Sequence, residues 1–211
     1  MVQSVAMTYR VGILLFDDVE VLDFAGPFEV FSTASRVVER TGAPPAFEVV
    51  TVAAGSPVRA RHGLIVSPGY RMGEEPPIDV LVVPGGVVTG ALADARTIEW
   101  ISSRAAIAGL TTSVCTGAFL LAETGLLDGR PATTHWEDLD DLAAAYPRVL
   151  VRREVAWVDD GDVVTSAGIS AGIDMSLHVV ARLLGEEWAS ATALQMEYSA
   201  GEFGAAPRAG R

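Results

Sequence analysis

The apolar residues of this chain fall into short runs that alternate with stretches of helical periodicity. Continuous apolar runs rich in β-branched residues are typical of strands buried on both faces. Such runs predict strands at residues 10–16, 47–53, 79–83, 110–114, 149–158 and 163–167. A less regular stretch with a His-Gly turn predicts a small hairpin at residues 58–66, at the edge of the sheet.

Helices are predicted where apolar residues recur three and four positions apart. They are expected from Gly26-Pro27 to Thr41-Gly42 and at residues 97–108, 116–124, 136–146, 170–184 and 187–198. Strands alternating with helices indicate one α/β domain over residues 1–211, a mostly parallel sheet with helices on both faces. Its core is expected at about residues 10–198, and residues 199–211 are expected to form a loose tail.

Unusual residues follow three of the predicted strands. Asp23 comes shortly after the first, Gly85-Gly86 follows the strand at 79–83, and Cys115 follows the strand at 110–114. Ligand sites in parallel sheets lie at the carboxyl ends of the strands. We therefore expect these residues to converge on one site.

Cys115 lies at a predicted strand-to-helix turn, in the sequence Ser-Val-Cys-Thr-Gly. This resembles a nucleophile elbow, although Ser113 stands where that pattern has its first glycine. Unpaired N–H groups and the positive end of the helix dipole would stabilise a thiolate there. The alternative is a small buried cysteine that fills space in the core.

The Pro-Gly-Gly segment before the second predicted helix suggests an anion site. The N–H groups of Gly86 and Thr116 could form a two-donor oxyanion hole. The alternative is an ordinary turn. The spacing of glycines at residues 85–90 does not fit a dinucleotide-binding fingerprint.

Asp23 lies between apolar neighbours just before the predicted helix at Gly26-Pro27. It could cap that helix. Alternatively, it could face the site as a carboxyl whose pKa is raised by burial and by a neighbouring thiolate. Glu20 is its nearest competitor as an acid. His135 could reach Cys115 as a base or binder, whereas His178 is expected in the core or an interface. No pair of histidines has metal-binding spacing, so no metal site is predicted.

Composition excludes several classes of function. The 211 residues carry 15 Arg, no Lys, 27 acidic groups and a net charge of −12, with a pI near 4.6. Without lysine there is no Schiff-base or P-loop chemistry, and the negative field disfavours nucleic acid. No membrane span or secretory signal is predicted. One cysteine among 211 residues indicates a reducing cytoplasm.

Several segments together resemble the ThiJ/PfpI superfamily, especially its isocyanide hydratase branch. They are Gly-Ile-Leu-Leu-Phe at 12–16, Leu-Asp-Phe-Ala-Gly-Pro at 22–27, Val-Pro-Gly-Gly at 83–86, Thr-Ser-Val-Cys-Thr-Gly at 112–117, Ala-Thr-Thr-His-Trp at 132–136 and Ala-Gly-Ile-Ser-Ala-Gly-Ile-Asp at 167–174. The resemblance implies a flavodoxin-like three-layer sandwich, a homodimer, a small-molecule substrate and no cofactor. It implies Cys115 as nucleophile, Asp23 as acid, oxyanion N–H groups from Gly86 and Thr116, and Ile169 beside the cysteine.

Two departures and a second resemblance bear on the activity. Protease-like members have His directly after the cysteine, where this chain has Thr116, which argues against peptidase activity. Deglycase-like members have Glu where this chain has Asp23, which favours a hydratase over a glyoxalase or deglycase. The segments at 113–117 and 132–136 also resemble the sensor domain of AraC-type regulators. Because the sequence stops at Arg211 without a further domain, DNA binding is not expected, but a ligand- or redox-sensing role stays open.

Overall fold

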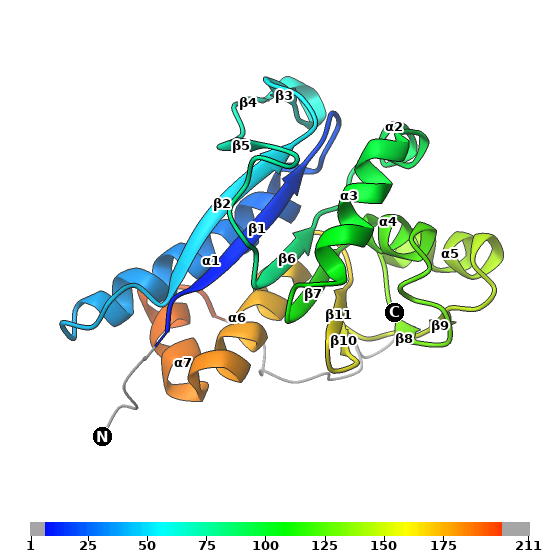
Figure 1. The fold of residues 1–211 in the computed structure, drawn as a ribbon. Coiled ribbons are helices and arrows are strands. Elements are labelled where there is room, and N and C mark those ends of the chain that lie inside the picture. The colour runs from blue at the N-terminus through cyan, green and yellow to red at the C-terminus, as the bar shows by residue number, and fades with distance from the viewer. Residues whose placement is uncertain (1–6, 200–211) are drawn as a thin grey trace.

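A seven-stranded sheet divides the computed structural model, which describes residues 7–199, into two helical layers (Figure 1). In spatial order its strands are β10 (Trp157–Asp159), β11 (Val163–Ser166), β7 (Leu110–Val114), β6 (Val80–Val83), β1 (Tyr9–Leu15), β2 (Phe47–Ala53) and β5 (Tyr70–Arg71). All neighbours are parallel except β10, which is antiparallel to β11. The order β2-β1-β6-β7-β11 is the flavodoxin-like one, which confirms the predicted fold class.

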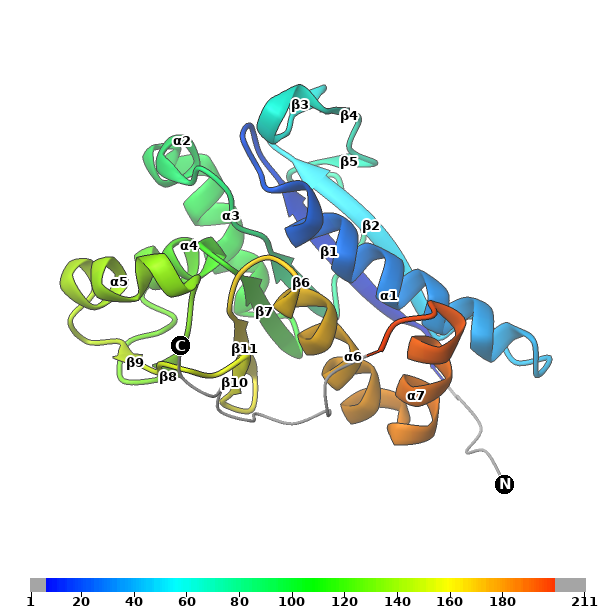
Figure 2. The same ribbon diagram turned by 180° about the vertical axis from the view of Figure 1, so that it is seen from behind.

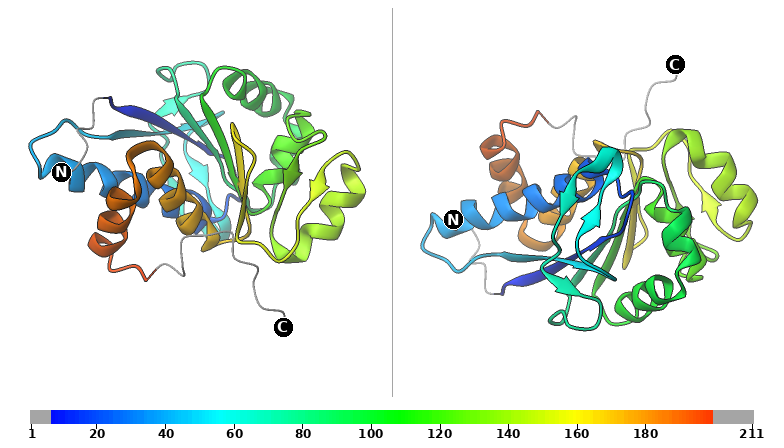
Figure 3. Two further views of the ribbon diagram at one scale, coloured as in Figure 1. Left: turned by 90° about the horizontal axis from the view of Figure 1, so that it is seen from below. Right: turned by 90° about the horizontal axis from the view of Figure 1, so that it is seen from above.

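Helices cover both faces of this sheet. They are α1 (Val21–Glu39), α2 (Thr89–Ala93), α3 (Ala95–Ala105), α4 (Gly117–Glu123), α5 (Leu139–Ala145), α6 (Ala171–Leu184) and α7 (Glu186–Gln195). Helices α1, α6 and α7 pack against one another on one face, and α2, α3 and α4 form the layer on the other (Figures 2 and 3). The predicted helices are therefore confirmed with shifted ends, and a 3-10 turn, η2 (Trp136–Asp138), precedes α5. The predicted tail lies outside the described residues from position 200 onward.

The hairpin predicted at 58–66 is confirmed as an antiparallel pair, but its placement at the edge of the main sheet was wrong, as was the continuous strand predicted at 149–158. The stretch 58–66 forms a separate antiparallel pair, β3 (Val58–Arg59) and β4 (Ile65–Val66), with the 3-10 turn η1 (Arg61–Gly63) between them, and the sheet edge is β5. The stretch 149–158 is divided into β9 (Leu150–Val151), which pairs with β8 (Pro131–Ala132), and β10. Glu154, between them, has φ +59°, a left-handed conformation that a continuous strand does not accommodate.

Helix α1 begins before the glycine and proline that were expected to open it. It starts at Val21 and runs through Pro27, which has no N–H to donate within the helix. Both Gly26 and Pro27 are buried, and a Cβ on Gly26 would lie 3.0 Å from Ile173 of α6. Packing against α6 thus overrides the local preference of the Gly-Pro pair.

The core lies on both faces of the central strands. Ile13, Leu14 and Leu15 of β1 and Leu81 of β6 are fully buried, which explains why these runs are apolar at every position. The carboxyl ends of the strands carry the loops that matter for function. Figure 1 shows the β3–β4 pair and α2 at this edge, at the top of the view.

Candidate functional site

Cys115 lies between the end of β7 and the start of α4, in a left-handed conformation with φ +57°. Its backbone is held from two sides, because its N–H donates to the Ser166 carbonyl at 3.1 Å and its carbonyl accepts from Thr134 Oγ1 at 2.8 Å. A positive φ is uncommon for a residue with a side chain and is found at strained functional turns. The side chain is buried, with 7% of the residue exposed.

Gly117 makes this turn possible by close packing. A Cβ at that position would overlap the Val83 carbonyl oxygen and crowd the Pro84 backbone. The first turn of α4 can therefore lie directly against the end of β6 only when residue 117 is glycine. This places the turn carrying Cys115 next to the loop that carries Gly85 and Gly86.

Asp23 lies in the first turn of α1 and is fully buried. Its Oδ2 atom accepts the Gly85 N–H at 3.1 Å, and within residues 7–199 its buried Oδ1 atom has no hydrogen-bond partner. The alternative of a helix cap was wrong, because Glu20 occupies the N-cap position and Asp23 bonds across to another loop. The carboxyl interacts with the Cys115 thiol.

Burial dominates the electrostatics of this pair. It raises the pKa of Asp23 to about 7, helped by the nearby Glu20 charge and opposed by the Gly85 N–H. Burial, with the Asp23 charge, also raises the pKa of the Cys115 thiol to about 12. The Thr116 N–H and hydroxyl do lower that pKa, as expected at a helix start, but they are outweighed. The expectation of a stabilised thiolate was therefore wrong: near pH 7 the thiol keeps its proton, while Asp23 is divided between its protonated and ionised forms.

The expected two-donor oxyanion hole is not available in this geometry. The Gly86 N–H donates to Thr116 Oγ1 at 2.9 Å, and the same hydroxyl lies 2.9 Å from the Gly86 carbonyl oxygen. Gly86 has φ +138°, and a Cβ there would overlap the Asp18 carbonyl oxygen, so its role is close backbone packing. The Thr116 N–H is instead directed at the Cys115 sulfur.

His135 and Ile169 lie on the side of Cys115 formed by the end of β11. A Cβ on Gly168 would overlap the His135 ring and lie 3.2 Å from Cys115 Sγ, so ring and sulfur flank the same glycine. His135 Nδ1 lies 3.4 Å from Asp138 Oδ2. Ile169 follows Gly168 and is 38% exposed.

The other titratable candidates have partners of their own. Glu20 forms an ion pair with Arg61 at 3.0 Å. His178 lies 2.6 Å from Asp159 and packs on the Trp157 ring, so it belongs to a contact within the chain. Within residues 7–199, no three His, Cys, Asp or Glu side chains are grouped so that they could hold a metal.

Arg61, Thr134 and Gly168 contribute to the site although the sequence analysis gave them no role. Gly168 and Thr134 stand in segments that the resemblance did quote, so a systematic check of small and hydroxyl residues there could have found them. Arg61 carries no such signal. Only the folding of the β3–β4 pair onto the start of α1 brings it near Asp23.

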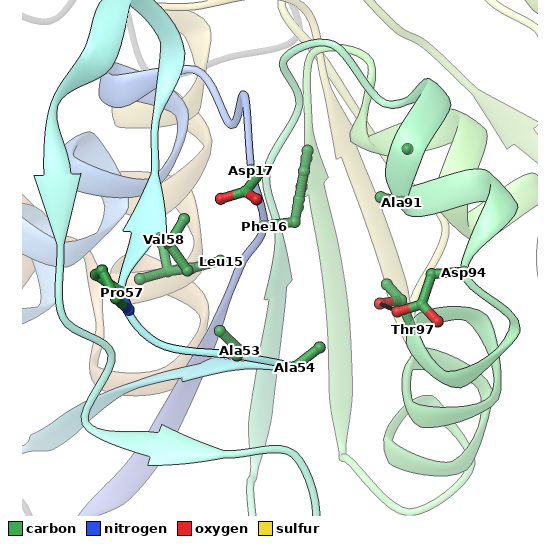
Figure 4. A pocket seen from close by; sticks show the side chains of 12 residues that line it. Leu15, Phe16, Asp17, Ala53, Ala54, Pro57, Val58, Ala91, Asp94 and Thr97 are labelled. Atoms are coloured by element: carbon green, nitrogen blue, oxygen red, sulfur yellow. Dashed lines mark hydrogen bonds between the residues drawn. The ribbon is translucent and has the colours of Figure 1, made fainter.

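A pocket of about 280 Å³ opens at the same edge of the sheet. Figure 4 shows Pro57 and Val58 on one side of it and Asp94 and Thr97 on the other, with Phe16 between them. Neither Cys115 nor Asp23 lines it. The pocket therefore lies at the same edge of the sheet as the Asp23–Cys115 pair but does not contain it.

Comparison with known proteins assigns the family. The model described as the DJ-1/PfpI family matches residues 9–182. The chain belongs to the DJ-1/PfpI family. It is 37% identical to the isonitrile hydratase of Pseudomonas putida over 195 residues, which are 92% of this chain and 80% of that protein. The crystal structure of a ThiJ/PfpI family protein from Pseudomonas syringae superposes with a TM-score of 0.81 at 31% identity, covering 92% of this chain and 77% of the other.

Regulators are also among the relatives of this DJ-1/PfpI protein. The HTH-type transcriptional regulator GbdR of Pseudomonas aeruginosa is 30% identical over 182 residues. The match covers 86% of this chain but 48% of the regulator. This chain thus resembles both an enzyme and a transcriptional regulator.

Proposed function

We propose that this protein is an isocyanide hydratase-like enzyme that adds water to an isocyanide and releases an N-substituted formamide. The observation that carries the proposal is the buried Asp23 carboxyl facing a cysteine thiol at a left-handed strand-to-helix turn. The similarity to an isonitrile hydratase over 92% of the chain supports the same reading. In this proposal Cys115 occupies a nucleophile elbow.

The first half of the proposed reaction joins the substrate to the enzyme. The Cys115 sulfur attacks the terminal isocyanide carbon, forming the S–C bond, while the thiol proton passes to Asp23. The Thr116 N–H, directed at the sulfur, stabilises the thiolate as it develops. Asp23 then delivers the proton to the carbon, which gives a thioimidate, R–N=CH–S–Cys115.

The second half releases the product. Asp23, now a carboxylate, accepts a proton from a water molecule, which attacks the thioimidate carbon. The proton taken up by Asp23 passes to nitrogen, the proton of the added hydroxyl passes to sulfur as the C–S bond breaks, and the formamide R–NH–CHO leaves with the thiol restored. The overall change is the addition of one water, so no electron donor or acceptor takes part. An Asp23 pKa of about 7 suits a group that must both accept and donate a proton near neutral pH.

The proposal is tested by supplying purified protein with a simple alkyl isocyanide and, in parallel, with methylglyoxal. Formamide production that disappears in Cys115→Ala, with a thioimidate mass adduct on the cysteine-containing peptide of the wild type, is the expected result. Cys115→Ala should keep its circular dichroism spectrum, since one sulfur atom is lost from a small buried side chain. Wild-type turnover in that variant would end the covalent mechanism, and turnover of methylglyoxal alone would favour a glyoxalase or deglycase.

A second candidate is a ligand- or redox-sensing protein, favoured by the 30% identity to a transcriptional regulator over 86% of this chain. It predicts no turnover of either substrate and selective oxidation of Cys115 by dilute peroxide. The raised pKa of the thiol opposes rapid oxidation. Sluggish oxidation together with formamide production would therefore separate the two candidates in favour of the enzyme.

A further inference from the structure

The β3–β4 pair is tied to the start of α1 by backbone hydrogen bonds. The Arg61 N–H donates to the Val19 carbonyl at 2.9 Å, and the Asp18 N–H donates to the Arg59 carbonyl at 2.8 Å. The same segment is tied on its other side to the loop after β6, where the Glu20 N–H donates to the Gly85 carbonyl at 2.9 Å. The β3–β4 pair is thus anchored to the segment before α1, and that segment is anchored in turn to the loop that holds Gly85.

These contacts place an ion pair beside the buried carboxyl. Arg61 Nη1 lies 3.0 Å from Glu20 Oε2. Glu20 directly precedes α1, and its carbonyl accepts the Asp23 N–H at 3.2 Å. The Glu20 side chain is 19% exposed and that of Arg61 47%, so solvent screens their fields incompletely.

The surroundings of Asp23 supply little other charge. The loop after β6 presents the Gly85 N–H, and the turn after β7 presents the Cys115 thiol. Arg61 comes from η1, and Glu20 is the N-cap of α1. From α6 the apolar Ile173 packs on α1 at Gly26. His135, beyond the thiol, faces Asp138. Two charged side chains act on Asp23 from this side: Glu20 raises its pKa and Arg61 lowers it.

We propose that Arg61 is a positioning residue for the Asp23–Cys115 pair: its ion pair with Glu20 offsets the field of that carboxylate and so sets the pH at which the pair becomes reactive. The effect on the reactivity of Cys115 does not depend on the proposed function; only its consequence for catalytic turnover does. Without Arg61, Glu20 would stand alone beside Asp23 and favour its protonated form. Without Glu20, Arg61 would favour the carboxylate.

The test measures alkylation of Cys115 by iodoacetamide as a function of pH, which needs no substrate because the chain has one cysteine. Ionisation of Asp23 sets a step in this profile, because the carboxylate charge opposes the thiolate. Arg61→Met should move the midpoint of that step to higher pH and Glu20→Gln to lower pH, each by about 0.5–1 pH unit. The double variant should return close to the wild-type profile.

Arg36→Met is the matched control, because Arg36 forms a similar ion pair with Glu29 farther along α1, and it should leave the midpoint unchanged. Unchanged midpoints in folded Arg61→Met and Glu20→Gln, or shifts in the same direction, would overturn the proposal. Should Arg61→Met fail to fold, Arg61→Lys keeps the charge and must keep the midpoint, while Glu20→Gln alone must still lower it. Hydration of an isocyanide, measured on the same variants, separates the two ideas: shifted alkylation without any turnover leaves this inference standing and removes the proposed function.

Discussion

At the scale of single residues, the reactivity of the site depends on how protons are distributed between Asp23 and Cys115. Asp23 and Cys115 are both buried, and burial raises the pKa of each. Interacting groups of this kind titrate as a pair, so the reactivity of the cysteine cannot be separated from the ionisation of the aspartate. Substitutions at Asp23 therefore test both the chemistry and the electrostatics.

Asp23→Asn should slow turnover by about 10²–10⁴-fold, because an amide can neither accept nor deliver the proton. Asp23→Ala should be at least as slow. Both variants should lower the pKa of the Cys115 thiol, since the neighbouring negative charge is gone. Turnover of both variants, with thiol alkylation against pH, provides the measurement. Near-normal turnover in Asp23→Asn would remove Asp23 from the mechanism and leave His135 as the remaining candidate near the sulfur.

The same residue makes stability depend on pH. The Asp23 carboxyl has an ordinary pKa of 3.8 and a folded-state pKa of about 7, so between these values the folded state binds more protons than the unfolded state. Its contribution to stability is therefore present below about pH 4 and is lost as the pH rises toward 7. Urea unfolding at several pH values should show a gap between wild type and Asp23→Asn that changes by on the order of a few kcal/mol over this range. A gap that stays constant with pH would contradict the raised pKa.

At the scale of elements, the turn between β7 and α4 depends on close packing of the α4 backbone against the end of β6. Gly117 of α4 lies against the end of β6, and Gly86 lies against the loop after β1. Neither glycine is explained by its local sequence alone. Both are required where loops from different strands converge at the carboxyl edge of the sheet.

Gly117→Ala should destabilise the fold by about 1–3 kcal/mol, because the added methyl group overlaps the Val83 carbonyl and the backbone must move. Gly90→Ala is the matched control: Gly90 is also in the first turn of a helix, and a Cβ there meets nothing within 4 Å. That variant should be neutral or stabilised by up to about 1 kcal/mol. Chemical denaturation measures both. Equal stabilities of the two variants would show that the contact at Gly117 is not limiting.

At the scale of the whole molecule, the two C-terminal helices are used within the chain. Trp188, Ala189 and Ala193 of α7 are buried, and α7 packs on α1 and α6. These apolar side chains thus pack within the chain, and His178 of α6 contacts Asp159 and Trp157. Large apolar side chains that stay exposed include Leu22, Phe28 and Leu194. Among residues 7–199 no helix is long and apolar enough to cross a membrane.

We expect a homodimer in solution, chiefly because of the resemblance to the ThiJ/PfpI superfamily, and the exposed apolar side chains are compatible with it. Light scattering coupled to size-exclusion chromatography should give twice the 22.2 kDa of one chain at micromolar concentration. A mass of one chain over that range would contradict the prediction. Because the chain carries a net charge of −12, the measurement should be made at moderate salt, where repulsion between copies is screened.

The amino-acid sequence by itself determined the strand and helix alternation and the convergence of Asp23, Gly85 and Cys115, because buried strands and their carboxyl-end turns leave strong local signals. Only the tertiary structure decided which atoms meet. In the folded chain the Gly86 N–H donates to Thr116, Asp23 lies within α1, and Arg61 forms an ion pair with Glu20. The pKa values of Asp23 and Cys115 are also decided only by the tertiary structure. They depend on burial and on charges from separate segments, and desolvation and long-range fields exist only once those segments are packed together.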